Sequence, residues 1–599
     1  MTVRCAIRPA NPAAHLFHVT VTLENPDPAG QRFLLPAWVP GSYMIREFAR
    51  HIVRLNAMAS DRRLRVEKLD KHTWRCAPTH ETITLAYEVY AWDLSVRAAH
   101  LDDTHGFFNG GCVFLLPLGR ECEPCRVDLL PPEGRRYAKW RVITGLAPLR
   151  SKGHAIARGD FGAYVAADYD ELIDCPVEMG TFVHEEFYVL GVPHEIAITG
   201  NVPRLDLPRL TADLARLCAA HITLFEPRQK KAPFARYHFL TMAIGDAYGG
   251  LEHRNSTALV CRREDLPFIG MKDTTENYRT FLGLASHEYF HTWNVKRIKP
   301  AAFVPYDLTR ENYTRLLWAF EGFTSYYDDL LLARAGLWTE AQYLEAIGKT
   351  VSTVMQRSGR LKQSVADSSF DAWIKYYRQD ENTPNSMVSY YQKGALIGLA
   401  LDLFIRAATS GRGSLDDAMR LLYRRWRDAG ADYRGVAENE FPEVVLEATG
   451  VDVRSQLREW TAGTRDPDFA ALLAPFGIAF VRQAALEQPH FALLGVKLAT
   501  GAECTLANVF DGSPAQLAGL SGGDTLIALD GLRATAANID KLLARYRPDD
   551  AVEALAFRRD ELRRFQIRLA SQPPLKFVLQ LDAKANRQAL RMRRRWLRG

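Results

Sequence analysis

The stretch Ser286-His287-Glu288-Tyr289-Phe290-His291-Thr292-Trp293-Asn294 contains the pattern His-Glu-x-x-His, around which the rest of the chain is organised. Residues four apart share one face of a helix, so His287 and His291 direct two imidazoles at one point. One small cation accepts both nitrogens at about 2.0–2.1 Å. Glu288 lies on the flank, where it can act as general base toward a water that the metal activates. The stretch therefore predicts a metal-dependent hydrolytic site on a helix.

The residues before this pattern favour a well-formed helix. Asp273-Thr274-Thr275-Glu276 resembles a capping box, with Asp273 in the capping position. Apolar residues then recur at helical spacing and predict a buried face: Tyr278, Phe281, Leu282, Ala285 and Tyr289.

A carboxylate in a second predicted helix is available as the third metal ligand. Glu321 lies in the most apolar part of that helix, where a carboxylate is costly unless it is paired or bound to a metal. Two histidines and one glutamate leave the fourth position of a tetrahedral zinc open for water, as in catalytic sites. Two alternatives stay open: Glu321 pairs with a lysine or arginine, or Glu311 is the ligand. The apolar positions of this helix are Leu316, Phe320, Phe323 and Tyr327.

His287, His291, Trp293 and Glu321-Gly322-Phe323 resemble the zinc aminopeptidases of the gluzincin class. The long interval between the histidines and Glu321 resembles the glycyl aminopeptidase family more than the alanyl/leucyl-type enzymes. That family joins a thermolysin-like catalytic domain to a PDZ domain. The resemblance implies a zinc-dependent aminopeptidase with one zinc per chain, which removes small N-terminal residues (glycine or alanine) from peptides with a free N-terminus.

Gly249-Gly250-Leu251-Glu252-His253 resembles the G-x-M-E-N segment that forms an edge strand beside the zinc in related aminopeptidases. The resemblance implies that the backbone at Gly249 and Gly250 pairs with the peptide and that Glu252 binds its α-amino group. A carboxylate fixed there favours a charged N-terminus and makes the enzyme an exopeptidase. Leu251 and His253 depart from the family's pattern. The alternative is that Glu252 is a solvated turn residue.

Ser389-Tyr390-Tyr391-Gln392-Lys393-Gly394 contains the Tyr-x-Lys-Gly pattern of the same relatives. The resemblance assigns to Tyr391 a hydrogen bond to the oxyanion of the tetrahedral intermediate. A phenol suits this role because it stays protonated at neutral pH. Tyr390 is the competing residue, and a place in the core is the alternative for either.

We expect a multidomain α+β protein. Residues 1–180 predict an antiparallel, sandwich-like β domain, because apolar and polar residues alternate in runs such as 17–23 and 83–91. The family resemblance makes residues 181–475 a thermolysin-like, mainly helical zinc catalytic domain. Residues 573–599 form a basic tail that Trp596 and Leu597 interrupt, and we expect a helix there that lies on the body with its charges in solvent. The alternative is a nucleic-acid or membrane-surface patch.

Residues 476–572 resemble a PDZ domain. Leu493-Leu494-Gly495-Val496 resembles its carboxylate-binding loop, and residues 538–546 would form the groove helix. Such a groove binds the C-terminus of an extended peptide by strand addition. The alternative is a docking domain that binds no ligand.

Composition is that of a globular protein, with 47% hydrophobic and 24% charged residues among 599. The net charge of +6 is dispersed outside the tail and does not predict a nucleic-acid partner. Residues 1–9 show no secretory signal, and no run of eighteen apolar residues predicts a transmembrane segment, so we expect a cytoplasmic protein. Nine scattered cysteines fit a reducing compartment, and we interpret Cys122-Glu-Pro-Cys125 as a structural turn.

Two other functions compete with the aminopeptidase. An endopeptidase or carboxypeptidase would share the zinc site but would not need Glu252. A peptide-binding scaffold would use the PDZ domain and leave the protease idle. The presence of every metal and acid–base residue argues against the scaffold.

Overall fold

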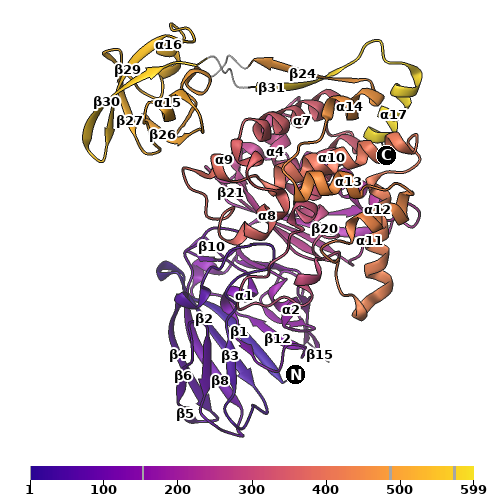
Figure 1. The fold of residues 1–599 in the computed structure, drawn as a ribbon. Helices are drawn as coiled ribbons and strands as arrows, with labels where there is room; N and C mark the ends of the chain where they lie inside the picture. The colour runs from indigo at the N-terminus through magenta and orange to yellow at the C-terminus, as the bar shows by residue number, and fades with distance from the viewer. Residues whose placement is uncertain (1, 152–153, 485–488, 571–574, 599) are drawn as a thin grey trace. The chain divides into compact units, whose positions relative to one another are not determined.

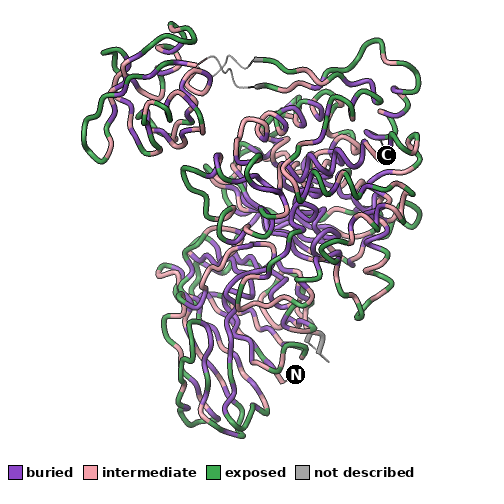
Figure 2. The backbone as a smooth tube through the Cα atoms, in the orientation of Figure 1, coloured by how far each residue is buried: buried purple, intermediate pink, exposed green. Residues whose placement is uncertain are grey.

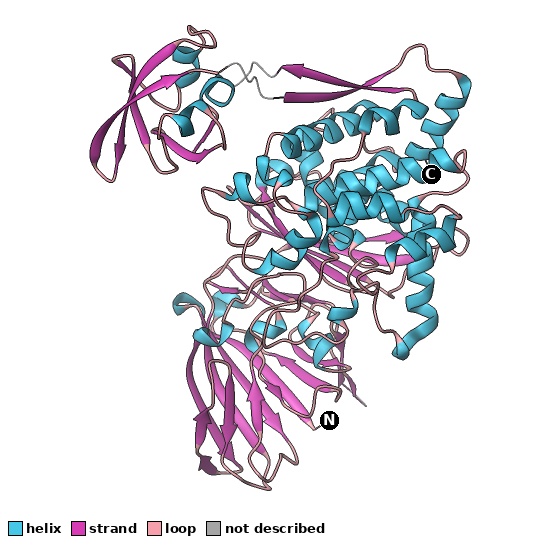
Figure 3. Cartoon of the chain, viewed as in Figure 1, coloured by secondary structure: helices cyan, strands magenta, loops and turns pink. Residues whose placement is uncertain are grey.

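The computed structural model describes residues 2–151, 154–484, 489–570 and 575–598, and both helices and strands are abundant (Figures 1 and 3). The chain forms two compact units. Unit 1 comprises Met1–Asn312 with Tyr423–Val436, and unit 2 comprises Tyr313–Leu422 with Ala437–Gly599. The predicted domain boundaries after residues 180 and 475 stay predictions, and the boundary between 572 and 573 lies outside the described residues.

The N-terminal part of unit 1 is built from β-sheets, as its alternating sequence predicts. Along β2 (Leu16–Leu23), Phe17, Val19 and Val21 are buried and His18 is exposed. The largest sheet has the order β14-β17-β12-β1-β2-β8-β4-β5. Its neighbouring strands are antiparallel except for β1 and β12, which are parallel. The strand bounds in this sheet are β1 Val3–Asn11, β4 Ile52–Ala59, β5 Arg62–Leu64, β8 Ile83–Tyr90, β12 Cys125–Leu129, β14 Ala147–Pro148 and β17 Gly162–Ala166.

Two four-stranded sheets and a short hairpin complete this part of the chain. The sheet orders are β13-β18-β10-β9 and β11-β3-β7-β6, and the hairpin pairs β15 with β16. The bounds are β3 Arg32–Leu34, β6 Val66–Lys68, β7 Thr73–Cys76, β9 Ala99–Leu101, β10 His105–Phe108, α1 Gly110–Val113, β11 Leu116–Pro117, β13 Arg141–Thr144, β15 Arg150–Ser151, β16 His154–Ala155, α2 Tyr169–Ile173 and β18 Val177–Gly180.

A mixed five-stranded sheet follows in unit 1, with the order β19-β20-β21-β23-β22. Strand β22 therefore lies at its edge. The hydrophobic core of the N-terminal sheets continues into this sheet through Leu240, Leu251 and Ala258. The bounds are β19 Val183–Val189, β20 Val192–Thr199, β21 Tyr237–Ile244, β22 Gly249–Glu252 and β23 Ser256–Arg262.

Helices α3 (Leu207–Phe225) and α4 (Glu276–Phe290) pack against this sheet. The His-Glu-x-x-His pattern spans the last turn of α4 and its C-cap residue, His291. The predicted capping residue of α4 is wrong. Thr275, not Asp273, is the N-cap, and its hydroxyl accepts a hydrogen bond from the Tyr278 N–H at 3.1 Å. Both residue types cap helices well, and the one that reaches the third N–H of the first turn decides where the helix begins.

Unit 2 is mainly helical from α5 to α14 (Figure 3). Gly322 and Gly394 let α5 and α6 cross α10 closely, because a Cβ on Gly322 would lie 2.5 Å from the Gly394 Cα. The bounds are α5 Leu317–Phe320, α6 Gly322–Arg334, α7 Glu340–Met355, α8 Val365–Phe370, α9 Thr383–Ser386, α10 Tyr390–Ala408, α11 Leu415–Ala429 (which passes into unit 1 at Tyr423), α12 Phe441–Thr449, α13 Arg454–Leu457 and α14 Phe469–Leu473.

The C-terminal part of unit 2 contains two further groups of strands. Strands β24 (Ile478–Ala484) and β31 (Leu575–Leu581) form an antiparallel pair, and between them in sequence lies a six-stranded sheet with its own apolar core. Strand β25 is at the edge of that sheet. The bounds are β25 Val496–Leu498, β26 Cys504–Val509, α15 Pro514–Leu517, β27 Thr525–Leu529, β28 Leu532–Arg533, α16 Ile539–Leu543, β29 Ala551–Arg558 and β30 Glu561–Arg568.

The basic tail forms helix α17 (Arg587–Arg598), as predicted. Its apolar residues Ala589, Met592, Trp596 and Leu597 are buried, while most of its arginines are exposed (Figure 2). Arg593 departs from this pattern because it forms an ion pair with Glu340 at 2.6 Å. Among the described residues, none of the helices has the length and apolar character needed to cross a membrane. All nine cysteines are free.

Candidate active site

Helix α4 brings the two predicted metal-binding histidines together. The Nε2 atoms of His287 and His291 are 3.1 Å apart, and the ring planes are inclined by 84°. Nitrogens bound to one tetrahedral cation at about 2.0–2.1 Å would be about 3.3 Å apart. The observed separation is therefore close to that of two ligands of one ion.

The orientation of His291 is fixed by the turn that follows α4. Its Nδ1–H donates a hydrogen bond to the Asn294 carbonyl at 2.8 Å, which leaves Nε2 with the lone pair. The role of Asn294 has no signal in the sequence, because the contact is made by a main-chain oxygen that any residue type supplies. The two imidazoles thus form a donor pair that fits zinc.

Two buried glutamates lie beside these histidines. Glu288 is 5% exposed, and Glu252 is 3% exposed, so Glu252 is not the solvated turn residue that was the alternative. One carboxylate oxygen of each and one ring nitrogen of His291 lie within 4.8 Å of one another. Glu252 Oε1 has no hydrogen-bond partner among the described residues. A buried carboxylate oxygen without a donor favours a cationic ligand.

Glycines of the edge strand make room for Glu288. A Cβ on Gly250 would overlap the carboxylate of Glu288, so only glycine lets α4 approach β22 in this way. The N–H of His253 donates to the Ser256 carbonyl at 3.0 Å. Because bonded and non-bonded pairs alternate along antiparallel strands, the amide groups of Gly250 and Glu252 point away from β23 toward the free edge.

In unit 2 the structure brings Glu321 near Tyr391. Glu321 is 2% exposed at the junction of α5 and α6, whereas the competing Glu311 is half-buried. Burial and the charge of Glu321 raise the pKa of the Tyr391 phenol well above its ordinary value, so it stays protonated at neutral pH. Tyr391 is half-buried, and its Oη lies 3.2 Å from the Tyr377 Oη. Tyr390 is completely buried.

Two family descriptions match the sequence. The Peptidase M61 N-terminal domain matches residues 4–181, and M61 glycyl aminopeptidase matches residues 280–397. The crystal structure of an aminopeptidase N family protein from Idiomarina loihiensis has 38% sequence identity and a TM-score of 0.92, covering 99% of this chain and 100% of that one. The chain belongs to the M61 glycyl aminopeptidase family. As a member of that family, it is a peptide hydrolase.

The M61 chain also has more distant matches among solved structures. A crystal structure of an M1 zinc metallopeptidase from Deinococcus radiodurans has 14% identity and a TM-score of 0.48, and covers 78% of this chain and 94% of that one. No match was found among curated protein sequences.

Two contacts to the edge strand of the M61 chain come from turns of the N-terminal β region and were missed in the sequence. Arg97 Nη2 donates a hydrogen bond to the Gly250 carbonyl at 3.1 Å. Gly41, which has a φ of +98°, lies against Glu252, and a Cβ there would overlap the carboxylate. Neither contact has a local signal, because the paired residues are more than 150 positions apart.

His253, which departs from the family's pattern, has a partner of its own in the M61 chain. Its Nδ1 lies 3.3 Å from Asp174 Oδ1, and Lys296 Nζ lies 2.6 Å from the same oxygen. Although burial opposes the charge of Asp174, Lys296 and Arg254 hold the pKa of its carboxyl well below the ordinary value. This buried ion cluster anchors the end of β22 directly after Glu252.

Proposed function

We propose that this M61 chain is a zinc-dependent aminopeptidase that removes small N-terminal residues, glycine or alanine, from peptides. The observation that carries the proposal is the cluster of His287, His291, Glu288 and Glu252 beside an edge strand. The imidazoles suit a zinc ion, and the two buried carboxylates suit a proton acceptor and an ammonium site. We propose one catalytic zinc ion per chain.

The proposed zinc ligands are His287, His291 and Glu321. The fixed tautomer of His291 and the deep burial of Glu321 support this assignment. When bound, zinc supplies Lewis-acid polarisation of the peptide carbonyl and lowers the pKa of water to about 7.

The side chains of the protein divide the remaining work. Glu288 accepts a proton from the attacking water and returns it to the leaving amine. Glu252 binds the α-ammonium group, and the free edge of β22 at Gly249 and Gly250 pairs with the substrate backbone, with the outward Gly250 N–H as a donor. Tyr391 donates a hydrogen bond to the oxyanion. The half-buried position of Tyr391 supports it over Tyr390, which is completely buried.

The peptidase proposal predicts a loss of activity on metal removal. We expect chelator-treated protein to lose turnover of glycyl and alanyl chromogenic substrates and to regain it with zinc. N-terminally acetylated forms of the same peptides should not be cleaved. Equal cleavage of acetylated and free peptides would instead favour the endopeptidase, and inactivity of the zinc-loaded protein would favour the scaffold.

Replacing Glu252 by Gln tests the exopeptidase assignment directly. A charged hydrogen bond contributes about 1.5–3 kcal/mol, so kcat/KM for free peptides should fall about 10- to 100-fold. The metal content should not change. Glu185→Gln, which alters an exposed residue of β19 in the same sheet, is the matched control. A variant at Glu252 with unchanged kcat/KM contradicts the assignment.

We also propose that residues 476–572 act as a PDZ-type module for C-terminal peptides. Edge strand β25 has an unpaired side in the described sheet, and α16 lies within residues 538–546, the segment expected to form the groove helix. Gly495, which is part of the predicted carboxylate loop and directly precedes β25, has a φ of +69°. The domain boundaries and a cytoplasmic location remain predictions.

A further inference from the structure

The hairpin of β9 and β10 carries a second cluster of possible ligands in unit 1, with the spacing His100-x-Asp102-x-x-His105. His100 lies opposite Phe107 in the antiparallel register. His105 is two residues from Phe107, and Asp102 is two residues from His100, so period-2 alternation places all three on one face. The tight turn, in which the Asp102 N–H donates to the His105 carbonyl at 3.0 Å, brings them together.

The distances in this cluster are long for charged hydrogen bonds. His100 Nε2 lies 3.3 Å from Asp102 Oδ2, and His105 Nδ1 lies 3.6 Å from Asp102 Oδ1. Charge-assisted hydrogen bonds between nitrogen and carboxylate are about 2.7–2.9 Å. Two ligands on one tetrahedral zinc, with bonds of about 2.0–2.1 Å, are about 3.3 Å apart. One donor atom from each residue lies within 4.8 Å of the others.

The burial of the two rings is a second, independent observation. His100 is 5% exposed and His105 is 3% exposed, and the rings stack with centroids 4.9 Å apart. His100 Nδ1 and His105 Nε2 have no hydrogen-bond partner among the described residues. The nitrogens that face Asp102 are His100 Nε2 and His105 Nδ1, and these are the atoms that a shared cation would use. Neutral imidazole is the form that binds metals.

The site is also accessible and has room for water. A cavity of about 20 Å³ borders both rings and Glu178, which is enough for about one water molecule. The Asp102 side chain is 26% exposed, so an ion can reach it from solvent. Three groups of the turn compete for Asp102 Oδ1: the Thr104 hydroxyl at 2.6 Å, the Thr104 N–H at 2.7 Å and the His105 N–H at 3.1 Å. The Thr104 hydroxyl also lies 3.3 Å from His105 Nδ1.

We propose that His100, Asp102 and His105 bind a second divalent cation of the zinc class. Two imidazoles and a carboxylate suit zinc, and water completes the coordination. This ion would fix the β9–β10 hairpin, and the segment leading into that hairpin contains Arg97, which bonds to the Gly250 carbonyl of the edge strand. Its role is therefore structural, and it does not depend on the proposed peptidase chemistry.

The test separates this site from the proposed catalytic one. In the background His287→Ala/His291→Ala, chelator-treated protein should bind one equivalent of zinc per chain by mass spectrometry and calorimetry, and zinc should raise Tm. Adding His100→Asn/His105→Asn should remove both the bound zinc and the Tm shift. The matched control adds His18→Asn/His80→Asn, at exposed positions, and should retain both.

Either of two results with these variants overturns the proposal. One is a background variant that binds no zinc, which would leave a histidine–aspartate hydrogen-bond cluster. The other is zinc binding that survives the His100/His105 replacement, which would place the ion elsewhere. If that replacement does not fold, Asp102→Asn keeps both rings and should lower zinc affinity at least tenfold, whereas unchanged affinity also overturns the proposal. Loss of peptidase activity in the background variant alone bears only on the proposed function.

Discussion

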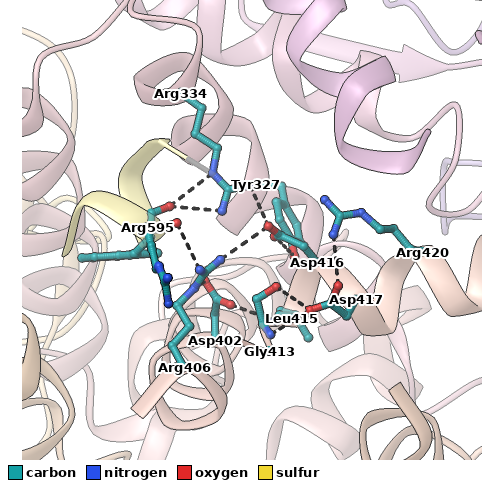
Figure 4. A network of polar contacts seen from close by, with 12 residues as sticks. Tyr327, Arg334, Asp402, Arg406, Gly413, Leu415, Asp416, Asp417, Arg420 and Arg595 are labelled. Carbon is teal, nitrogen blue, oxygen red and sulfur yellow. Dashed lines mark hydrogen bonds and ion pairs between the residues drawn. The ribbon is translucent and has the colours of Figure 1, made fainter. Parts of the chain in front are cut away.

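Two groups of buried charges in this chain differ in how their charges are compensated. In unit 2, Asp402 and Asp416 face Arg334 and Arg406 in a network of ion pairs (Figure 4). In unit 1, Glu252 and Glu288 are buried about as deeply, yet Glu252 Oε1 has no hydrogen-bond partner among the described residues. Buried charge is expensive unless it is paired. The network of Asp402, Asp416, Arg334 and Arg406, which we call the balanced network, therefore stabilises the fold. The Glu252–Glu288 cluster, which we call the unbalanced cluster, is suited to binding ligands.

The balanced network holds the C-terminal helix in place. Arg334 Nη2 donates to the Trp596 carbonyl at 3.1 Å, and Arg406 Nη1 donates to the Arg595 carbonyl at 3.1 Å. Trp596 Nε1 donates to the Tyr326 hydroxyl at 2.9 Å. These contacts tie α17 to α6 and α10, so a segment rich in arginine acts as a structural element of unit 2.

Glu288→Gln tests whether the Glu252–Glu288 cluster is functional rather than structural, and we expect it to have the largest effect on activity. Gln retains the shape but cannot accept the proton, and general-base catalysis contributes about 10²–10⁴-fold. We expect kcat to fall by about that factor while zinc content and Tm stay near wild type. Kinetics, mass spectrometry and thermal unfolding of one preparation measure these three quantities. Glu276→Gln, at an exposed position of the same helix, serves as control. Retained turnover would rule Glu288 out as the general base.

Local patterns in the sequence predicted the parts of the site that share one element. His287, Glu288 and His291 are four residues apart or fewer on one helix, so helical periodicity alone places them together. Glu252 and Tyr391 required a family resemblance, because a single glutamate after two glycines or a tyrosine before a lysine is not distinctive. The N-cap of α4 was predicted wrongly as Asp273, because Asp273 and Thr275 are both good capping residues and lie within three positions.

Long-range contacts could not be predicted. Arg97 and Gly41 reach the edge strand from turns that are distant in sequence, and nothing in their neighbours indicates the destination. The antiparallel β domain was predicted from alternation, but alternation does not encode strand direction, so the parallel pairing of β1 and β12 was missed. Helix α17 was predicted because Trp596 and Leu597 interrupt its basic residues.

Gly250→Ala should have an intermediate effect on activity, because it disturbs the Glu252–Glu288 cluster without removing a functional group. The added Cβ would displace the Glu288 carboxylate or move β22. A displacement of about 1 Å in a catalytic group costs about 10²-fold in rate. We expect kcat/KM to fall by about that factor with zinc still bound. Gly245→Ala is the matched control, since its Cβ would meet nothing closer than 3.8 Å. Equal activity of the two variants would show that Glu288 tolerates the shift.

Asp416→Asn should have the smallest effect on activity and a clear effect on stability. Asp416 accepts hydrogen bonds from the Tyr327 hydroxyl at 2.9 Å and from Arg334 at 3.0 Å. Breaking a buried pair costs about 3–5 kcal/mol in the free energy of unfolding, because Arg334 and Arg406 lose a counter-charge. The specific activity of folded protein should stay within about twofold of wild type. Asp428→Asn, at an exposed position of α11, should change neither quantity.

The difference in unfolding free energy between wild type and Asp416→Asn should depend on pH, and this dependence distinguishes loss of charge from loss of packing. Burial opposes ionisation of Asp416, but Arg334 and Arg406 outweigh it and lower the pKa of its carboxyl to about 2. The unfolded value is about 3.9, so the charge contributes its full stability above that pH, and the contribution is lost as the pH falls toward 2. The gap in unfolding free energy between wild type and Asp416→Asn, measured by denaturant titration, should therefore narrow below about pH 4. A gap of constant size across that range would mean that shape rather than charge makes the network stable, and the contrast with the Glu252–Glu288 cluster would then lose its electrostatic basis.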